Sequence, residues 1–309
     1  MPRTLVIANP KSGRITPRGW KRLEDKLRDA LGPIDVAITR APRDAERIAR
    51  EGVRAGIERL VVAGGDGTLS EVASGLLSAE LGGYAAIGIL PLGTGSDFFR
   101  TLGGPKQIDR AIEQLAEGKA RGIDAGRVTF RDVRGKPATS YFANVASLGL
   151  SGLVDQLVNR SAGVKLLGGR VSFLIGTLSA LVRYRAEPVS LFLDEEPVFE
   201  GRVALAAVAN GQFFGGGMRV APSARPDDGQ LDLVIVPDSP KLRLLGRLPR
   251  LYRGTHVQFS DTLECRGRLI EARAAEGGVP LDVDGEPLGS LPASFEVLPN
   301  ALTLFGCSA

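Results

Sequence analysis

Short apolar runs alternate with longer amphipathic segments along the first part of the chain. The runs at Thr4 to Ala8, Leu60 to Ala63 and Tyr84 to Leu90 have the length and composition of buried strands. The segments Trp20 to Leu31 and Arg43 to Ala55 carry apolar residues at helical spacing, and a glycine follows each of them. This alternation predicts a doubly wound, mostly parallel α/β sheet with helices on both faces.

The pattern changes after Asp124, where short strands separated by turns replace the alternation. Segments such as Tyr141 to Ser147 and Leu231 to Val236 predict an antiparallel β-sandwich. Helical or irregular insertions are expected at Ser151 to Tyr184 and Leu242 to Arg253. We therefore expect an α/β domain over residues 1–127 and a β-sandwich domain over residues 128–309. A final segment of about 15 residues is able to return to the first domain.

Composition places the chain among ordinary globular proteins. Of its 309 residues, 43% are hydrophobic and 24% are charged, so two domains can each bury a core. The two cysteines, Cys265 and Cys307, provide no disulfide framework and no CxxC spacing for zinc. The longest apolar run, Val171 to Val182, is shorter than the roughly 20 residues that cross a bilayer. We expect a cytoplasmic protein that is at most peripheral to a membrane.

Positive charge is concentrated in two segments that contain no acidic residue. One lies between Asp155 and Glu187 and the other between Asp238 and Asp261, although the net charge is only +4. Neither segment has the interleaved aromatic residues that stack on nucleic-acid bases. Basic residues around apolar positions favour an anionic membrane surface. The solvated face of an ordinary helix remains an equal alternative.

The segment Leu60 to Val72 combines a strand run, a glycine turn and a helix start. Gly64, Gly65 and Gly67 interrupt regular structure, and Thr68 and Glu71 have the spacing of a capping box. A helix start after a glycine turn presents free amides and a positive dipole end, which favours phosphate binding. Asp66 would repel phosphate there, so a metal ion or a proton-transfer task is indicated. The alternative is a βα turn in which Asp66 caps the helix.

Three further strand ends also carry polar or glycine-rich loops. These are Asn9 to Gly13, Thr39-Arg40 and Gly93 to Asp97. Ligands of open parallel sheets bind outside the carboxyl ends of the strands, so the four loops outline a nucleotide site. The Walker pattern GxxxxGK[ST] is absent, and metal ions and backbone amides must neutralise the phosphates.

Five motifs together resemble the bacterial diacylglycerol kinase family of lipid kinases. They are NPKSG at 9–13, GGDGTLSEV at 64–72, GTGSDFFRTL at 93–102, GGGMRVAPSARPDDGQLD at 215–232 and VDGE at 283–286. This family is similar to sphingosine and ceramide kinases and, more distantly, to NAD kinases. The motifs span nearly the whole chain in order, and the combination of NPxSG, GTxxDFxR and a late DGE is more specific than GGDGT alone.

The resemblance implies ATP as donor and a requirement for Mg²⁺. The implied nucleotide contacts are Asn9, Pro10, Lys11, Ser12, Gly13, Thr39, Gly64, Gly65, Asp66, Gly67, Thr68, Leu69, Ser70, Glu71, Gly93, Thr94 and Ser96. The implied catalytic acids are Glu286, Asp66, Asp97 and Asp124. A structural Mg²⁺ is implied at the Asp228 carboxylate and the carbonyls of Arg225 and Gln230.

The reaction chemistry agrees with these implied roles. An alcohol is a weak nucleophile, so a carboxylate within hydrogen-bond reach accepts its proton during attack. The resemblance makes Glu286 the first choice for this base and Asp66 the second. From the residues alone, Asp284-Gly285 and Asp228-Gly229 are also typical hairpin turns, and Asp124 is also a turn residue at the domain junction.

Ser70 and Ser96 depart from the family, which often has asparagine at both positions. Serine has a shorter reach and lacks the paired donor and acceptor of an amide, so donor affinity or donor choice is affected. We therefore expect an ATP- and Mg²⁺-dependent kinase of a lipid hydroxyl, diacylglycerol or a relative, with no nucleic-acid partner. An NAD kinase and a nucleotide sensor without turnover are the alternatives, and a homodimer is left open.

Overall fold

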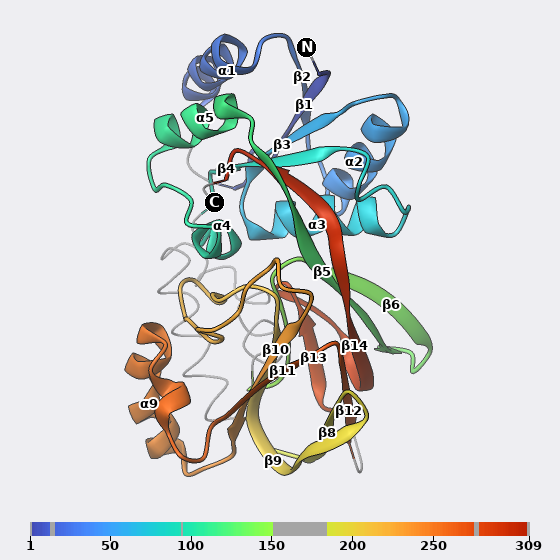
Figure 1. The fold of residues 1–309 in the computed structure, drawn as a ribbon, viewed down its shortest axis with the longest axis vertical. Coiled ribbons are helices and arrows are strands. Elements are labelled where there is room, and N and C mark those ends of the chain that lie inside the picture. Colours follow the sequence, from blue (N-terminus) through green and yellow to red (C-terminus); the bar gives the residue numbers. More distant parts are fainter. Residues whose placement is uncertain (1, 13–15, 94, 151–183, 275–277, 308–309) are drawn as a thin grey trace. The chain divides into compact units, whose positions relative to one another are not determined.

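The computed structural model describes all residues except 1, 13–15, 94, 151–183, 275–277 and 308–309 (Figure 1). Residues 1–123 and 300–309 form one compact unit, and residues 124–299 form a second. The insertion expected at Ser151 to Tyr184 lies almost entirely outside the described residues, together with most of the first basic segment. The two units are described separately below.

The first unit is built on a parallel sheet with the strand order β2-β1-β3-β4-β14. The strands are β1 (Thr4–Ala8), β2 (Ile34–Ile38), β3 (Arg59–Gly64), β4 (Ala86–Pro91) and the end of β14 (Glu286–Phe305). Every residue of β1 is buried, as expected for a strand whose two faces are both covered. The prediction of a doubly wound parallel sheet is confirmed.

Five helices accompany this sheet in the described part of the first unit. They are α1 (Pro17–Leu31), α2 (Asp44–Arg54), α3 (Asp66–Leu77), α4 (Asp97–Thr101) and α5 (Ile108–Glu117). Helix α1 shows clear start and stop signals, because the Thr16 hydroxyl accepts a hydrogen bond from the Gly19 amide at 3.1 Å and Gly32 ends the helix at φ 79°. Helices α2 and α3 pack closely, since a Cβ at Gly75 would lie 2.4 Å from the Glu46 carbonyl oxygen.

The capping box predicted at Thr68 and Glu71 is wrong. Helix α3 begins at Asp66, and no side chain of its N-cap residue, Gly65, is available to cap it. The Glu71 carboxylate instead accepts a hydrogen bond from the Ala45 amide at 3.1 Å, at the start of α2. The glycine pair allows the helix to start directly after the strand, which moves both side chains into the helix.

The second unit consists of antiparallel strands in two connected layers. The strands are β5 (Ala120–Asp132), β6 (Pro137–Phe142), β7 (Val145–Gly149), β8 (Pro188–Leu193), β9 (Glu196–Ala209), β10 (Leu231–Pro237), β11 (Leu263–Gly267), β12 (Leu269–Ala274), β13 (Pro280–Val283) and the first part of β14. One path runs β11-β10-β9-β7-β13-β14, and β8 and β12 connect the long strands β9 and β14. The predicted antiparallel sandwich is confirmed.

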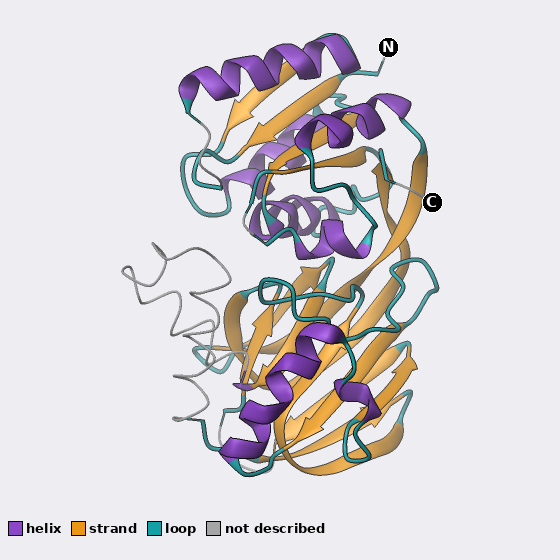
Figure 2. Cartoon of the chain, turned by 90° about the vertical axis from the view of Figure 1, so that its left-hand side faces the viewer, coloured by secondary structure: helices purple, strands orange, loops and turns teal. Residues whose placement is uncertain are grey.

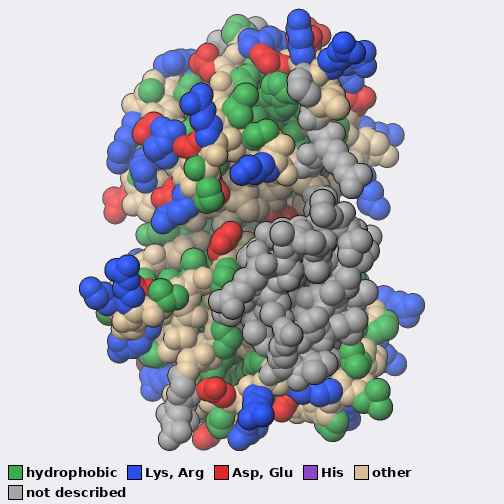
Figure 3. Space-filling view, turned by 180° about the vertical axis from the view of Figure 1, so that it is seen from behind, with side chains coloured by type: hydrophobic (Ala, Val, Ile, Leu, Met, Phe, Trp, Pro, Cys, Tyr) green, Lys and Arg blue, Asp and Glu red, His purple; other side chains and the backbone are tan. Residues whose placement is uncertain are grey.

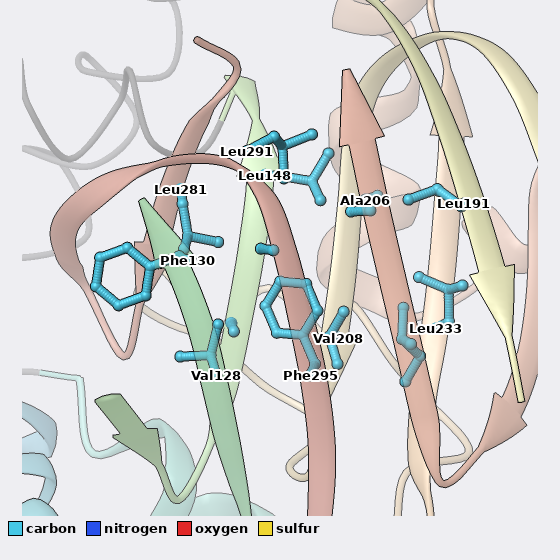
Figure 4. Close-up of a cluster of buried hydrophobic side chains, with 14 of the residues drawn as sticks. Val128, Phe130, Leu148, Leu191, Ala206, Val208, Leu233, Leu281, Leu291 and Phe295 are labelled. Carbon is cyan, nitrogen blue, oxygen red and sulfur yellow. The ribbon is translucent and has the colours of Figure 1, made fainter. Parts of the chain in front are cut away.

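Apolar side chains from both layers of the second unit fill its core (Figure 4). Phe295 and Leu281 are completely buried, as are Val208 and Leu233. Alternation along each strand sends these side chains inward. The opposite face of β9 and β10 is covered by a second cluster that includes Leu205, Val220 and Val234.

Helix α9 (Lys241–Arg253) and the short helix η1 (His256–Gln258) follow β10. Figure 2 shows α9 lying against the strands of this unit. Leu244 and Arg247 are its buried residues, and Gly254 ends it at φ 71°. The helical insertion predicted at Leu242 to Arg253 is thus observed.

Candidate active site

The predicted nucleotide loops of the first unit all follow the carboxyl ends of parallel strands. Asn9 follows β1 and Thr39 follows β2. The glycine loop that begins at Gly64 lies at the end of β3, and the glycine loop that begins at Gly93 follows β4. Backbone hydrogen bonds join neighbouring loops, from the Thr39 amide to the Ala8 carbonyl at 2.9 Å and from the Asn9 amide to the Ala63 carbonyl at 3.1 Å. Gly13 and Thr94 lie outside the described residues.

Asn9 links the first loop to α3. Its side-chain amide donates to the Thr68 hydroxyl at 3.0 Å, and its side-chain oxygen accepts from the Lys11 amide at 3.0 Å. The Ser12 hydroxyl and amide both donate to the Asn9 carbonyl. Pro10 continues this tight turn, which the strand end and α3 therefore hold in place.

The two glycine loops touch each other through their backbones. The Gly93 amide donates to the Gly64 carbonyl at 3.1 Å, and a Cβ at Gly93 would lie 2.5 Å from the Gly65 Cα. That distance is too short for any side chain, so glycine is required by the close approach. At Gly67 a Cβ would meet nothing within 4 Å, so the start of α3 faces open space.

Asp66 connects the same two loops through its carboxylate. Its two oxygens accept hydrogen bonds from the amides of Asp97 at 3.0 Å and Phe98 at 3.1 Å. Asp66 therefore caps a helix, but the helix is α4 and not its own helix α3. Asp97 is buried, and its carboxylate lies 3.3 Å from the Arg100 guanidinium.

Ser96 occupies a left-handed backbone conformation directly before α4. Its φ is 51°, and its hydroxyl makes a long contact of 3.5 Å with the Gly93 carbonyl. Asparagine adopts this conformation more readily than serine. The departure from the family at this position therefore affects the local backbone as well as hydrogen bonding. Ser70 lies in the first turns of α3 and is partly buried.

An apolar pocket adjoins the first loop and was not predicted from the sequence. It has a volume of about 720 Å³, including its open side. Trp20, Ile38 and Leu92 form its apolar wall beside Asn9 and Ser12. Ile38 is 52% exposed, which is unusual for a large apolar residue at the end of a buried strand. The sequence shows only that Ile38 is the last apolar residue before Thr39-Arg40, and its exposure is visible only in the structure.

In the second unit, Asp124 holds the turn that contains the predicted metal ligands. Its carboxylate accepts from the Gly229 amide at 2.7 Å, and its own amide donates to the Pro226 carbonyl at 2.7 Å. The side-chain amide of Asn210 donates to the Asp124 carbonyl at 2.9 Å. Asn210 was not predicted, and its complete burial within a polar turn is visible only in three dimensions.

Asp228 has one engaged and one unsatisfied carboxylate oxygen. Oδ1 accepts from the Gln230 amide at 3.1 Å, whereas Oδ2 is buried without a hydrogen bond and lies 3.6 Å from Arg266 Nη1. Burial raises the pKa of neighbouring Asp232 to about 6, with repulsion from Asp228 adding to the effect. Asp232 and Arg266 were not predicted, although an aspartate in the apolar run of β10 was a sequence signal.

These oxygens suit a hard cation such as Mg²⁺, which carboxylates and carbonyls bind. A buried carboxylate oxygen that accepts no hydrogen bond, with Arg266 no closer than 3.6 Å, is the observation that favours a cation beside Asp228. The carbonyls of Arg225 and Gln230 flank it in the chain. Within the described residues, no group of three or more His, Cys, Asp or Glu side chains is arranged to hold a metal.

The late VDGE motif forms a hairpin turn between β13 and β14. Asp284 has φ 51° and Gly285 has φ 88°, as a tight turn requires. The Asp284 carboxylate accepts hydrogen bonds from the amides of Ala143, Asn144 and Val145 at 3.0–3.1 Å. Glu286 begins β14 with an exposed side chain. The hairpin alternative is therefore correct for the backbone, and it leaves the Glu286 carboxylate at the surface of this unit.

Comparison with known proteins gives the class of the chain. Residues 3–128 match the diacylglycerol kinase catalytic domain, and residues 144–306 match the YegS C-terminal NAD kinase beta sandwich-like domain. The chain therefore belongs to the diacylglycerol kinase and YegS-like family of lipid kinases.

Curated relatives agree with this class, and solved structures agree with the fold. A probable lipid kinase YegS-like of Pseudomonas aeruginosa is 35% identical over 275 residues, which cover 89% of this chain and 85% of the relative. A diacylglycerol kinase of Mycobacterium tuberculosis is 30% identical over 260 residues, covering 84% and 80%. In fold, the chain is similar to a diacylglycerol kinase from Bacillus anthracis, with a TM-score of 0.71, 22% identity and coverage of 98% and 96%. Yeast NADH kinase has a TM-score of 0.55, 12% identity and coverage of 98% and 82%.

Proposed function

We infer that this lipid kinase transfers the γ-phosphoryl group of ATP, with Mg²⁺, to the hydroxyl of diacylglycerol or a related lipid. The observation that carries this proposal is the arrangement of the first unit. An uncapped helix start faces open space, beside an apolar pocket and between two glycine loops that Asp66 holds together. Family membership supplies the class of acceptor.

For the donor, the first amides of α3 bind phosphate oxygens. No side chain caps this helix, so its amides and the positive end of its dipole are available to an anion. The adenine ring fits the apolar pocket against Trp20 and Ile38. Trp20 is the only tryptophan in the chain, so its fluorescence reports this pocket. We expect ATP to quench the emission in a saturable titration. An unchanged spectrum at saturating ATP would show that adenine does not bind in this pocket.

For the acceptor, Glu286 is the better candidate for the base. Both Asp66 oxygens accept backbone hydrogen bonds that join the glycine loops, which is a structural task. The Glu286 side chain is exposed on a turn that Asp284 fixes. The Glu286 carboxylate takes the hydroxyl proton as the lipid oxygen bonds to the γ-phosphorus. The bond from that phosphorus to the β–γ bridging oxygen breaks, and ADP leaves.

The Asp228 carboxylate, with the Arg225 and Gln230 carbonyls, would hold a structural Mg²⁺. Such an ion neutralises acidic side chains that are crowded around one turn. Asp232 and Asp228 share a single close cation, Arg266, among the described residues. We expect removal of divalent ions to lower the melting temperature of the second unit, and Asp228→Asn to abolish that sensitivity.

A panel of acceptors tests the proposed reaction. The wild-type enzyme is incubated with γ-labelled ATP, Mg²⁺ and either dioctanoylglycerol, a total lipid extract or NAD. We expect label in a lipid product and none in NADP. Label in NADP alone would identify a small-molecule kinase, and saturable ATP binding without any labelled product would identify a nucleotide sensor.

The outer face of α9 is suited to peripheral contact with an anionic membrane. Leu242 is 82% exposed, and Arg243, Arg250 and Arg253 are exposed on a helix that contains no acidic residue. Elsewhere Lys and Arg side chains are spread among Asp and Glu, as on the face in Figure 3. None of the helices in the described ranges is long and apolar enough to cross a bilayer. Liposome flotation tests this contact, and equal recovery with neutral and anionic vesicles would argue against it.

A further inference from the structure

Asn210 is a completely buried polar residue directly after β9. Its side-chain nitrogen carries two hydrogens, and it donates to the Asp124 carbonyl at 2.9 Å and to the Ala143 carbonyl at 2.8 Å. Its side-chain oxygen is buried and accepts no hydrogen bond from the described residues. A buried acceptor without a donor costs stability, so packing alone does not account for an asparagine at this position.

The segment Ala143-Asn144 is held through both its amides and its carbonyls. It lies between the end of β6 and the start of β7, so its backbone groups need partners outside those strands. Asp284 accepts the two amides at 3.0 and 3.1 Å. Asn210 binds the two carbonyls, the first through its side chain and the second through its main-chain amide, at 2.8 Å each. Four hydrogen bonds thus join Asn210 to Asp284 through two residues.

Asp284 in turn fixes the hairpin that carries Glu286. Asp284 and Gly285 form the turn between β13 and β14, and Glu286 is the next residue. The Asp284 amide donates to the Val145 carbonyl at 3.0 Å, and its carboxylate accepts from the Val145 amide at 3.0 Å. A displacement of residues 143–145 would therefore move the backbone that carries Glu286.

Asp124 anchors the other side of Asn210. It is a buried residue within the long strand β5, and its carbonyl accepts one of the two side-chain hydrogen bonds of Asn210. Its carboxylate accepts from the Gly229 amide at 2.7 Å, which ties it to a further turn. Asn210 thus connects strand β5 with the segment that binds Asp284. Since the side chain is buried, it has little freedom to move away from either partner.

We propose that Asn210 is a positioning residue for Glu286. The inference rests on the proposed function, because that function makes Glu286 the base. Asn210 fixes the segment 143–144, this segment holds Asp284, and Asp284 holds the turn that carries the Glu286 carboxylate. A general base must lie within hydrogen-bond reach of the proton that it accepts, so a small displacement of this turn lowers turnover without changing nucleotide binding.

Turnover of the full chain tests whether Asn210 acts through Glu286. In Asn210→Ala we expect kcat with dioctanoylglycerol to fall about 10²-fold. The dissociation constant for ATP, measured by Trp20 fluorescence, is expected to keep its wild-type value. In a Glu286→Gln background, where no base remains to be positioned, the same substitution is expected to change the residual turnover by less than about twofold. An equal loss of turnover in both backgrounds would refute the proposal.

Hydrogen exchange measured by mass spectrometry separates this inference from the proposed function. Asn210→Ala is expected to speed exchange at residues 143–145 about tenfold, because their carbonyls lose a donor while Asp284 is intact. Unchanged exchange there would overturn the role of Asn210, whichever residue is the base. Wild-type turnover in Glu286→Gln would instead contradict the proposed base, with the exchange result unaffected.

Two further variants control for folding and for unspecific effects. Asn210→Ser retains one donor in a smaller side chain, and it replaces Asn210→Ala if the alanine variant does not fold. Its kcat is expected to fall about tenfold. Gln258→Ala removes an exposed amide side chain from the same unit and is expected to leave kcat and exchange unchanged. A loss of kcat in Gln258→Ala as large as in the Asn210 variants would refute the assignment.

The wild-type protein provides a test that depends on no substitution. The amides of residues 143–145 and of Asn210 are expected to exchange with protection factors within about tenfold of one another, because they open as one unit. Protection of the Asn210 amide combined with unprotected amides at 143–145 would refute the link between Asn210 and Asp284.

Discussion

Asp66 and Asp284 perform the same structural task in the two units. Asp66 accepts two consecutive amides at the start of α4, and Asp284 accepts three consecutive amides, the last of which belongs to the first residue of β7. Both aspartates follow short apolar strands and stand beside glycine. What differs is the neighbouring group, because Asp66 adjoins an uncapped helix start whereas Asp284 adjoins the exposed Glu286. An acidic residue in a glycine turn can thus support a site without being its reactive group.

Glu286→Gln has the largest expected effect and tests whether Glu286, and not an aspartate, is the reactive group. If Glu286 is the base and Asp284 its support, removing the Glu286 charge lowers kcat by about 10²- to 10⁴-fold. The melting temperature and the affinity for ATP remain at wild-type values. Single-turnover assays with dioctanoylglycerol, combined with ATP binding by Trp20 fluorescence, measure these quantities. Wild-type turnover in Glu286→Gln would remove the residue from the reaction.

Asn substitutions at Asp284 and Asp66 test whether both aspartates have the same structural role. Asparagine keeps one neutral acceptor oxygen and places an NH₂ group against the remaining amide, at a cost of about 3 kcal/mol for Asp284→Asn and about 2 kcal/mol for Asp66→Asn. Hydrogen exchange measured by mass spectrometry localises the effect. Faster exchange is expected at residues 143–145 in the first variant and at 97–98 in the second. A kcat loss in Asp66→Asn without faster exchange would instead make Asp66 the base.

The ion pair of Asp261 with Arg247 provides a pH test within the second unit. The hydrogen bond from Arg247 holds the pKa of Asp261 below its usual 3.8. The stabilisation is therefore fully present above about pH 4 and is lost as the pH falls through the depressed pKa. Because the Asp261 side chain is 35% exposed, Asp261→Asn costs only about 1 kcal/mol at neutral pH. Urea denaturation should show that difference at pH 7 and a smaller one at pH 3.

Ser96→Asn has the smallest expected effect. Asparagine tolerates the φ of 51° at this position better than serine, and stability is expected to rise by about 0.5 kcal/mol. The longer amide also restores the family's hydrogen-bonding pair, so the dissociation constant for ATP falls several-fold. Ser70→Asn is the matched control in regular helix, where no stability gain is expected. Unchanged stability and ATP affinity in Ser96→Asn would show that serine at this position alters neither the local backbone nor ATP binding.

Periodicity and glycine placement were sufficient to predict the fold. The strand Thr4–Ala8 has the bounds expected from the apolar pattern, and helix α1 ends at Leu31, where the following glycine predicted its end. The capping box was wrong because Gly64 and Gly65 let the helix begin before Thr68. The capping-box spacing assumes that a side chain caps the helix, so it cannot locate the start of a helix that has no such cap.

The site was predictable only as far as the motifs reach. Asn9, Asp66 and Asp284 could be located, but the partners of their side chains come from distant strands and helices. Trp20 belongs to no motif, and its importance follows from a pocket that forms only on folding. The roles of Glu286, Asp97 and Asp124 as catalytic acids and the Mg²⁺ ligands remain predictions.

A structure of the enzyme with a non-hydrolysable ATP analogue tests the central claim most directly. We expect phosphate oxygens within hydrogen-bond distance of the amides at the start of α3, with the adenine ring in the pocket beside Trp20 and Ile38. A nucleotide bound away from Asn9 and the two glycine loops would contradict it.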